Sequence, residues 1–182
     1  MKKKPDWKEW IKDKKECEEW LDSYIKRKVI IKDTDESKLF LKKANHNLNF
    51  ANWIVEQHNK EIPAFFGKET FYDWAISIYY YAIYHAALSL ISKKGHKSRS
   101  HAATLCFLIH DYYHTKKAIN KEDVELLAGQ LSKEDIETIG TSKETREKAS
   151  YDVHESFEKE LAKTTQKQAV DFVNKIKNII IG

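Results

Sequence analysis

Histidines and tyrosines are the side chains of this chain whose types and spacing point most directly to chemistry. Tyr79, Tyr80, Tyr81 and Tyr84 surround His85 within one long apolar segment. An imidazole titrates near neutral pH and can accept or donate a proton, and tyrosine rings can stack on bases of nucleic acid. The same pattern is typical of a helical core whose hydroxyls and imidazole are hydrogen-bonded, so both interpretations stay open.

A basic segment follows that apolar run and contains Lys93, Lys94, His96, Lys97 and Arg99. Such side chains can contact phosphates, although most basic loops are simply solvated. The net charge is +4, and residues 1–32 hold 11 Lys/Arg against 7 Asp/Glu, so the rest of the chain is neutral overall. The sequence therefore predicts a local cationic site rather than a broad electrostatic surface for nucleic acid.

Metal and nucleophile chemistry has weaker support. His110 and His114 are four residues apart and would share one face of a helix, but no third ligand stands at a motif spacing. We expect these histidines to be solvated or capping, and no bound metal. Cys17 and Cys106 are predicted to be buried free thiols of a reducing cytosol. The sequence has no Gly-rich phosphate loop, G-x-S-x-G, H-E-x-x-H or C-x-x-C, so P-loop hydrolases, serine esterases and zinc proteases lose their main support.

The elements that position these residues are predicted to be helices throughout. Apolar residues recur at three- and four-residue steps near residues 36–60, 69–94, 98–113 and 120–131 and in a last segment that ends at Gly182. Only 5 Gly and 2 Pro interrupt the chain, which favours long helices. We expect an all-α, antiparallel helical bundle of about five core helices over residues 36–182.

Residues 1–35 are predicted to form an N-terminal amphipathic helical extension. Trp7, Trp10 and Trp20 fall on its apolar stripe, and residues 29–32 are a short extended connector. The stripe predicts a helix packed onto the main domain, or one that binds a partner protein as a structural adaptor.

The helix near residues 69–94 is apolar nearly all round. Small side chains at Ala75, Ala82, Ala86 and Ser89 permit close helix approach. The segment is long enough to span a membrane, but Asp73 and its tyrosines favour a core helix covered by other helices or by a second subunit. The N-terminus lacks an apolar signal core, so we expect a cytoplasmic protein with no membrane contact.

Three motifs in this order resemble the HEPN family (higher eukaryotes and prokaryotes nucleotide-binding). They are YYAIYHAA over residues 80–87, a Gly-basic turn that leads into KSRSH over residues 97–101, and REKASY over residues 146–151. The family patterns are YYAxxHAA, a Gly-basic turn with Ser-His, and Arg-x-x-Ala-x-Tyr. A closing apolar helix matches residues 169–173, so the likeness covers roughly residues 36–181.

The resemblance implies a HEPN-like homodimer of RNA or nucleotide biology that acts as a metal-independent endoribonuclease of toxin or defence type, without a cofactor. Ribonuclease members carry an Arg, four to six residues, and then a His; here seven residues separate Arg146 from His154. The catalytic roles fall on Arg146 for phosphate stabilisation, on His154 for proton transfer and on Tyr151 for positioning. On one continuous helix His154 would lie roughly 80° around and about 12 Å along from Arg146, so a break near residues 150–153 or pairing across a dimer is required.

The resemblance also implies binding residues for RNA or a nucleotide: Lys97, Arg99, His101, Tyr81 and His85. The alternative is a non-catalytic nucleotide- or protein-binding module, antitoxin-like, that partners a nucleotidyltransferase. Glu147 supports this alternative, because it follows Arg146 where Asn, Asp or His is more typical of the ribonucleases. The long Arg–His spacing supports it as well.

Overall fold

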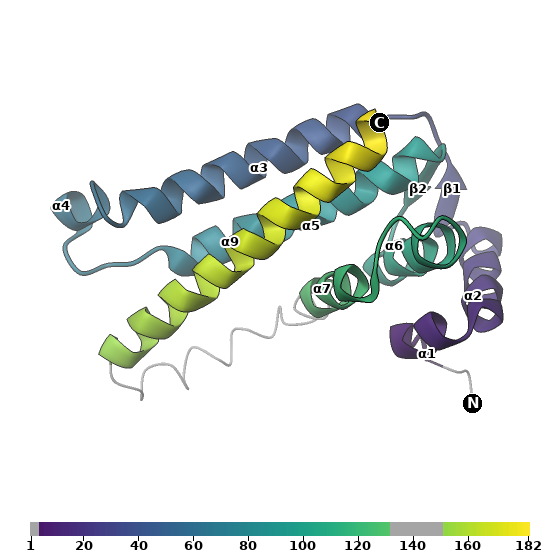
Figure 1. Ribbon diagram of the computed structural model, residues 1–182, viewed down its shortest axis with the longest axis horizontal. Helices are drawn as coiled ribbons and strands as arrows, with labels where there is room; N and C mark the ends of the chain where they lie inside the picture. Colours follow the sequence, from purple (N-terminus) through teal and green to yellow (C-terminus); the bar gives the residue numbers. More distant parts are fainter. Residues whose placement is uncertain (1–3, 132–150) are drawn as a thin grey trace.

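Helices account for nearly all regular structure in the described part of the chain (Figure 1). The computed structural model describes the backbone of residues 4–131 and 151–182, and the side chains of residues 4–129 and 158–182. The elements are α1 (Trp7–Lys12), α2 (Lys14–Lys26), β1 (Ile30–Lys32), α3 (Ser37–Gln57), α4 (Ile62–Phe66), α5 (Tyr72–Lys93), β2 (His96–Ser98), α6 (His101–Leu108), the π-helix η1 (Ile109–Thr115), α7 (Lys121–Leu131) and α9 (Tyr151–Ile181).

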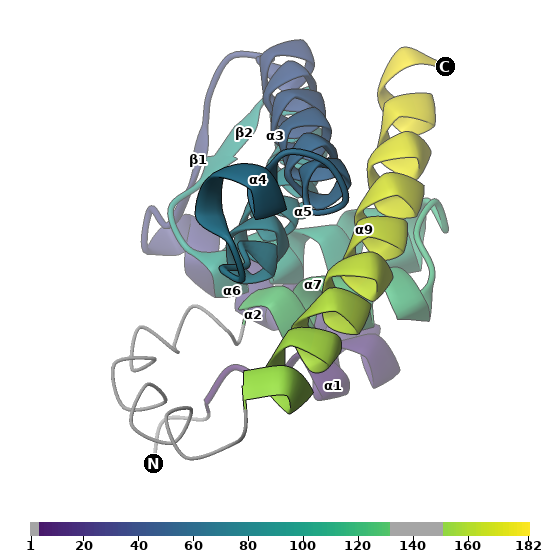
Figure 2. The same cartoon turned by 90° about the vertical axis from the view of Figure 1, so that its left-hand side faces the viewer.

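The long helix α5 lies between α3 and α9 and packs along both (Figures 1 and 2). Its small residues Ala75, Ala82 and Ala86 are fully buried, which lets the neighbouring backbones approach closely. One polar group joins the three helices: the Asn52 side-chain oxygen on α3 accepts hydrogen bonds from the Tyr79 hydroxyl at 2.7 Å and from the Gln166 amide at 2.8 Å. Burial raises the pKa of Tyr79, so the hydroxyl stays a neutral donor.

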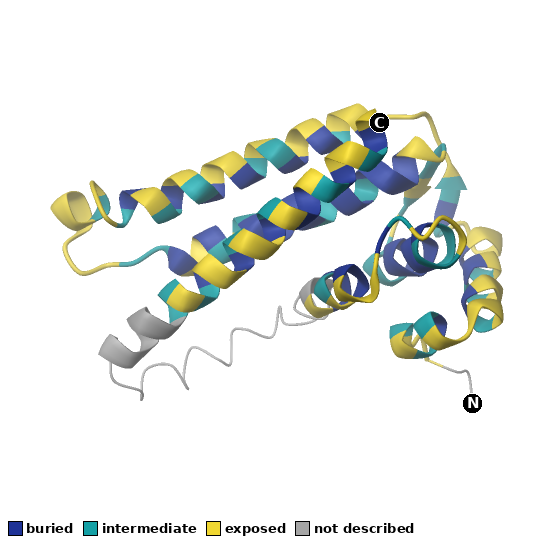
Figure 3. Cartoon of the chain, viewed as in Figure 1, coloured by how far each residue is buried: buried dark blue, intermediate teal, exposed yellow. Residues whose placement is uncertain are grey.

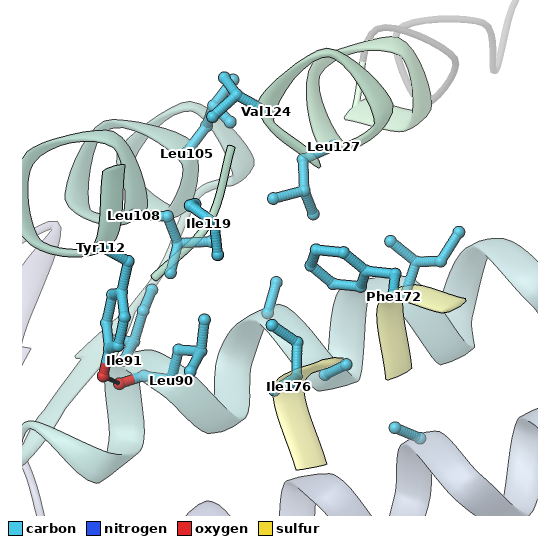
Figure 4. Close-up of a cluster of buried hydrophobic side chains, with 14 of the residues drawn as sticks. Leu90, Ile91, Leu105, Leu108, Tyr112, Ile119, Val124, Leu127, Phe172 and Ile176 are labelled. Atoms are coloured by element: carbon cyan, nitrogen blue, oxygen red, sulfur yellow. Dashed lines mark hydrogen bonds between the residues drawn. The ribbon is translucent and has the colours of Figure 1, made fainter. Parts of the chain in front are cut away.

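The core continues from α5 to α6, η1 and α7 (Figure 4). Leu90, Leu108 and Tyr112 meet Leu127 of α7 and Ile176 of α9 in a single apolar cluster. The Tyr112 hydroxyl is fully enclosed and donates to the Leu90 carbonyl at 2.8 Å. Buried residues therefore lie on the sides of these helices that face one another, and exposed residues lie on their outer sides (Figure 3).

The N-terminal extension packs against α6 and η1. Trp10 is 1% exposed, and Cys17 lies 3.9 Å from Cys106 of α6, measured between the two sulfur atoms. Each thiol lies 3.5 Å from the backbone carbonyl of the other cysteine. Both are free and buried, as predicted, and their contact with each other together with burial raises the pKa of the Cys106 thiol. The extension is packed onto the main domain, and Trp10, its most buried tryptophan, is not available to a partner.

The extension contains two helices where the sequence predicts one. Asp13 takes an extended conformation between α1 and α2, and its carboxylate accepts hydrogen bonds from the backbone N–H groups of Lys15 and Glu16. An aspartate in this position caps the following helix and satisfies donors that would otherwise be unpaired. The break turns α2 away from α1 so that both reach the main domain (Figure 1).

Strands β1 and β2 form a two-stranded antiparallel ribbon that joins the extension to the end of α5. Ile30 is paired with Ser98, and Lys32 with His96. Helix α2 ends before this ribbon in a Schellman motif, in which the Val29 N–H donates to the Tyr24 carbonyl and the Lys28 N–H to the Ile25 carbonyl. Lys28 therefore has φ of 56°, a left-handed conformation that costs a side-chain-bearing residue about 1–2 kcal/mol.

The all-α fold class is confirmed. Helices α3, α5, α6, α7 and α9 lie on the five segments where apolar periodicity predicts core helices. Ser100 is the N-cap of α6, and its hydroxyl accepts from the Ala103 N–H at 3.1 Å. The short helix α4 is an addition, because Pro63 favours its first turn after it has ended the α3 pattern.

One described helix, α5, is long and apolar enough to cross a membrane by length and composition. In its most apolar 18-residue window, 61% of the residues are buried inside the protein. The structure thus uses α5 as a core helix.

A buried and an exposed aliphatic side chain test this packing. Leu90 is fully buried, so Leu90→Ala should lower the free energy of unfolding by about 2–5 kcal/mol. Ile181 at the end of α9 is 65% exposed, so Ile181→Ala should change it by less than about 0.5 kcal/mol. Urea unfolding followed by circular dichroism measures both, and equal effects of the two substitutions would contradict the placement of α5.

Candidate functional site

Five aromatic and imidazole side chains form a cluster where α5 meets the start of α6. This tyrosine–histidine cluster consists of Tyr80, Tyr81, Tyr84, His85 and His101. The rings of Tyr80 and Tyr84 are stacked with centroids 6.2 Å apart, and the His101 ring lies 4.4 Å from that of Tyr84. The Tyr80 hydroxyl lies 3.3 Å from Nε2 of His101. The helical spacing of α5 and the Ser100 cap of α6 hold these side chains together.

His85 has a defined tautomer. Its Nδ1 lies 2.6 Å from the Tyr81 carbonyl, and a carbonyl can only accept, so Nδ1 carries the hydrogen. The Asn47 amide on α3 lies 3.4 Å from the same nitrogen. Burial lowers the pKa of His85 and outweighs the hydrogen bond to Tyr81, which raises it; the nearby Lys43 also lowers it. At neutral pH the ring is therefore neutral, and Nε2 is a hydrogen-bond and proton acceptor.

The cluster is open to solvent on one side. Tyr81 is 48% exposed, while Tyr84, His85 and His101 are half-buried and Tyr80 is buried. An exposed tyrosine ring backed by further rings is suited to stack a planar ligand such as a nucleic-acid base. The neutral His85 ring beside it can accept a hydrogen bond from that ligand.

Lys97 and Arg99 lie next to the cluster in the chain, on β2 and just after it. Both side chains are exposed. The Lys97 ammonium is 3.7 Å from the Asp33 carboxylate, and the Arg99 backbone N–H donates to the Val29 carbonyl at 2.9 Å. The strand pairing thus fixes the backbone of Arg99 two residues before His101. The structure brings the predicted binding residues Tyr81, His85, Lys97, Arg99 and His101 onto neighbouring elements.

The predicted catalytic residues are placed only in part. Tyr151 and His154 lie in the first turns of α9, whose backbone is helical from Tyr151 onward. Their side chains and the whole of Arg146 lie outside the described residues, so the roles predicted for these three residues stay predictions.

His110 and His114 do not converge. The Nδ1 of His110 lies 2.9 Å from the Asp111 carboxylate, and the Nε2–H of His114 donates to the Trp10 carbonyl at 2.7 Å. The π-helical backbone of η1 and these separate partners hold the two rings apart. Among the described residues, no group of three or more His, Cys, Asp and Glu side chains could hold a metal ion.

Asn47 is a site residue that sequence patterns do not single out. It comes from α3, and its position beside His85 follows from the antiparallel packing of α3 on α5. Its sequence signal is weak, because Asn47 is a polar residue at the edge of the apolar stripe that predicts the helix near residues 36–60. Tyr84 was part of the tyrosine group in the sequence, and the structure shows that it links His85 to His101.

The fold and this cluster define a small helical protein with an aromatic and imidazole cluster where its central helix meets α6, and with exposed cations on and just after β2. The chain is 27% identical over 146 residues to a UPF0332 protein of Archaeoglobus fulgidus, a match that spans 80% of this chain and 96% of that protein. No family model matches the chain, and no solved structure matches it.

The protonation state of His85 gives a testable prediction. Because burial lowers its pKa, an NMR titration should give a midpoint below the ordinary value of 6.5. The folded state then binds a proton at His85 less readily than the unfolded state, so stability should fall as the pH drops below 6.5. The variant His85→Gln, which cannot be protonated, should lose that part of the pH dependence. A titration midpoint above 6.5 would contradict the buried, neutral ring.

Proposed function

We propose that this chain is a HEPN-like protein that binds single-stranded RNA at the tyrosine–histidine cluster. The observation that carries the proposal is the half-exposed Tyr81 ring, whose centroid lies 5.1 Å from that of Tyr80 and 6.4 Å from that of the neutral His85. The exposed cations Lys97 and Arg99 follow on and just after the next element of the chain. Single-stranded nucleic acid is bound by such a combination of stacking rings and cations along the backbone.

The two parts of the surface contribute differently. A base stacked on Tyr81 is worth about 1–3 kcal/mol whatever its sequence. Lys97 and Arg99 supply charge to the backbone phosphates, and the guanidinium of Arg99 can hold two phosphate oxygens at once. His101 and His85 belong to the same cluster and would border the path of the strand.

We further propose that the bound RNA is cleaved by its own 2′-hydroxyl. The 2′-oxygen forms a bond to phosphorus and gives its proton to a base, while the bond from phosphorus to the 5′-oxygen breaks and that oxygen takes a proton from an acid. The products are a 2′,3′-cyclic phosphate and a 5′-hydroxyl. His154 of each subunit would transfer a proton, Arg146 would stabilise the phosphate charge, and Tyr151 would position the phosphate or ribose.

A homodimer is part of this proposal. Seven of the nine exposed large hydrophobic side chains in the described part of the chain lie on α3, α4 and α5: Leu39, Phe50, Trp53, Phe65, Phe66, Trp74 and Tyr81. The rings of Phe50 and Trp53 are stacked on each other with centroids 6.0 Å apart. A second copy that covers the part of this face away from Tyr81 would leave the Tyr81 ring open and bring two sets of cluster residues near one two-fold axis.

A second candidate function is a non-catalytic RNA- or nucleotide-binding module that partners a nucleotidyltransferase. Glu147 and the seven-residue gap between Arg146 and His154 favour it, because both depart from the ribonuclease pattern. This candidate binds RNA or a nucleotide at the same tyrosine–histidine cluster but does not cleave it.

Binding and cleavage of an oligouridylate in EDTA test the proposal together. Tyr81→Ala should weaken binding by about 5- to 150-fold, because it removes one stacked base. Tyr81→Phe keeps the ring and should bind like the wild type. Arg146→Ala and His154→Ala should each slow cleavage by about a hundredfold or more, since each removes charge stabilisation or proton transfer.

Folding by circular dichroism and dimerisation by sedimentation are the controls for each variant. Equal cleavage by the wild type and both variants would show a contaminant and contradict the catalytic roles. Tight RNA binding by an inactive wild type would favour the second candidate. Failure of the wild type to bind RNA would contradict the proposal as a whole.

A further inference from the structure

Arginine is rare in this chain, and its positions in the structure are not random. The sequence has 32 Lys and Arg residues, and only Arg27, Arg99 and Arg146 are arginines. Arg27 ends α2, and the chain reaches Val29 two residues later. The Val29 carbonyl accepts the Arg99 N–H, so the backbones of Arg27 and Arg99 come to the same end of the β1–β2 ribbon.

Lys28 lies between Arg27 and Val29 in the left-handed conformation, with φ of 56°. This is the C′ position of a Schellman motif, where glycine is the usual residue because it has no side chain to strain. A lysine here keeps an exposed positive charge at a turn where glycine would fit with less strain. Arg27, Lys28 and Arg99 are all exposed.

The Arg27 guanidinium is held in place by the extension itself. It lies over the Tyr24 ring at 5.0 Å, and its Nε–H donates to the Ser23 carbonyl at 3.3 Å. That contact uses one of the five guanidinium donors. A guanidinium that is already ordered loses less freedom when it binds a planar anion, and it suits phosphate better than the flexible lysine ammonium does.

We propose that Arg27, Lys28 and Arg99 form a phosphate-binding tip for the RNA strand whose base stacks on Tyr81. The inference rests on the proposed RNA-binding function and assigns part of the site to the N-terminal extension. Arg99 is two residues from His101 of the tyrosine–histidine cluster, so a strand that leaves the cluster reaches the tip over the ribbon. The extension then contributes directly to binding and lengthens the track along the RNA backbone.

Two matched lysines give the sharpest test. Lys117 is the second described lysine with a positive φ, at 52°, and it lies between η1 and α7 rather than at an end of β1 or β2. Lys28→Gly and Lys117→Gly each remove one charge and relieve the same kind of strain. Only Lys28→Gly should weaken binding of an oligouridylate, by about fivefold at 0.1 M salt, with a salt dependence reduced by about 0.7 in log–log slope.

Arg27→Gln and Arg99→Gln should lower the same slope, and Arg27→Lys should restore the slope but only part of the affinity. A merely structural role for Arg27 would change the melting temperature and leave the slope unchanged. Polyglutamate serves as a competitor, because an unspecific anion surface would bind it as well as RNA.

The outcomes separate this inference from the proposed function. If the wild type binds RNA and Tyr81→Ala weakens it, but Lys28→Gly behaves like Lys117→Gly, the tip is wrong and the cluster stands. Competition by polyglutamate as strong as that by RNA also overturns the tip. If the wild type does not bind RNA, both proposals fail.

Discussion

Burial of α5 is the constraint on which the rest of the structure depends. This helix carries apolar residues on nearly every side, so it needs neighbours on most of its surface. Helices α3 and α9 cover two sides, and α6 with α7 covers a third. The Tyr79 hydroxyl lies in the middle of this packing, and its bond to Asn52, which Gln166 shares, satisfies polar groups that would be costly to bury alone.

The side of α5 that these helices leave uncovered is where the candidate site forms. Trp74 and Tyr81 are exposed there, and His85 is half-buried beside Asn47. The buried side chains that surround α5 are therefore continuous with aromatic side chains on its open side, which are exposed to solvent. The β1–β2 ribbon brings the backbones near Arg27 and Arg99, from two distant parts of the chain, to its same end. Packing and the proposed binding surface thus have one origin in the sequence of α5.

The helices could be predicted because their signal is local. Three- to four-residue periodicity places α3 and α5, and a serine before the apolar run marks the start of α6. The sequence predicts the extended segment of residues 29–32, where β1 lies, but it could not predict the ribbon, because strands of three residues carry no period and Ile30 pairs with Ser98 far along the chain. The break between α1 and α2 at Asp13 could not be predicted either, because an aspartate on the polar side of one continuous amphipathic helix and an aspartate that caps a second helix give the same sequence pattern.

The candidate site likewise contains residues that local sequence spacing predicts and residues that only the folded structure reveals. Tyr81 and His85 share one helix, and Lys97, Arg99 and His101 follow soon after its end, so the sequence alone places them on neighbouring elements. Asn47 and Arg27 come from other elements, and only the packing of α3 and the strand pairing reveal them. The two cysteines show the same limit, since residues 89 positions apart lie in contact.

Photo-crosslinking tests the central claim most directly, namely that the open side of α5 is the RNA surface. An oligonucleotide that contains 4-thiouridine would be bound, irradiated and digested, and the attached residues identified by mass spectrometry. We expect adducts on Tyr81, Tyr84 or His85, which carry the rings, and on the segment from His96 to His101, which carries the cations. Adducts confined to the outer sides of α7 and α9, with none on α5, would contradict it.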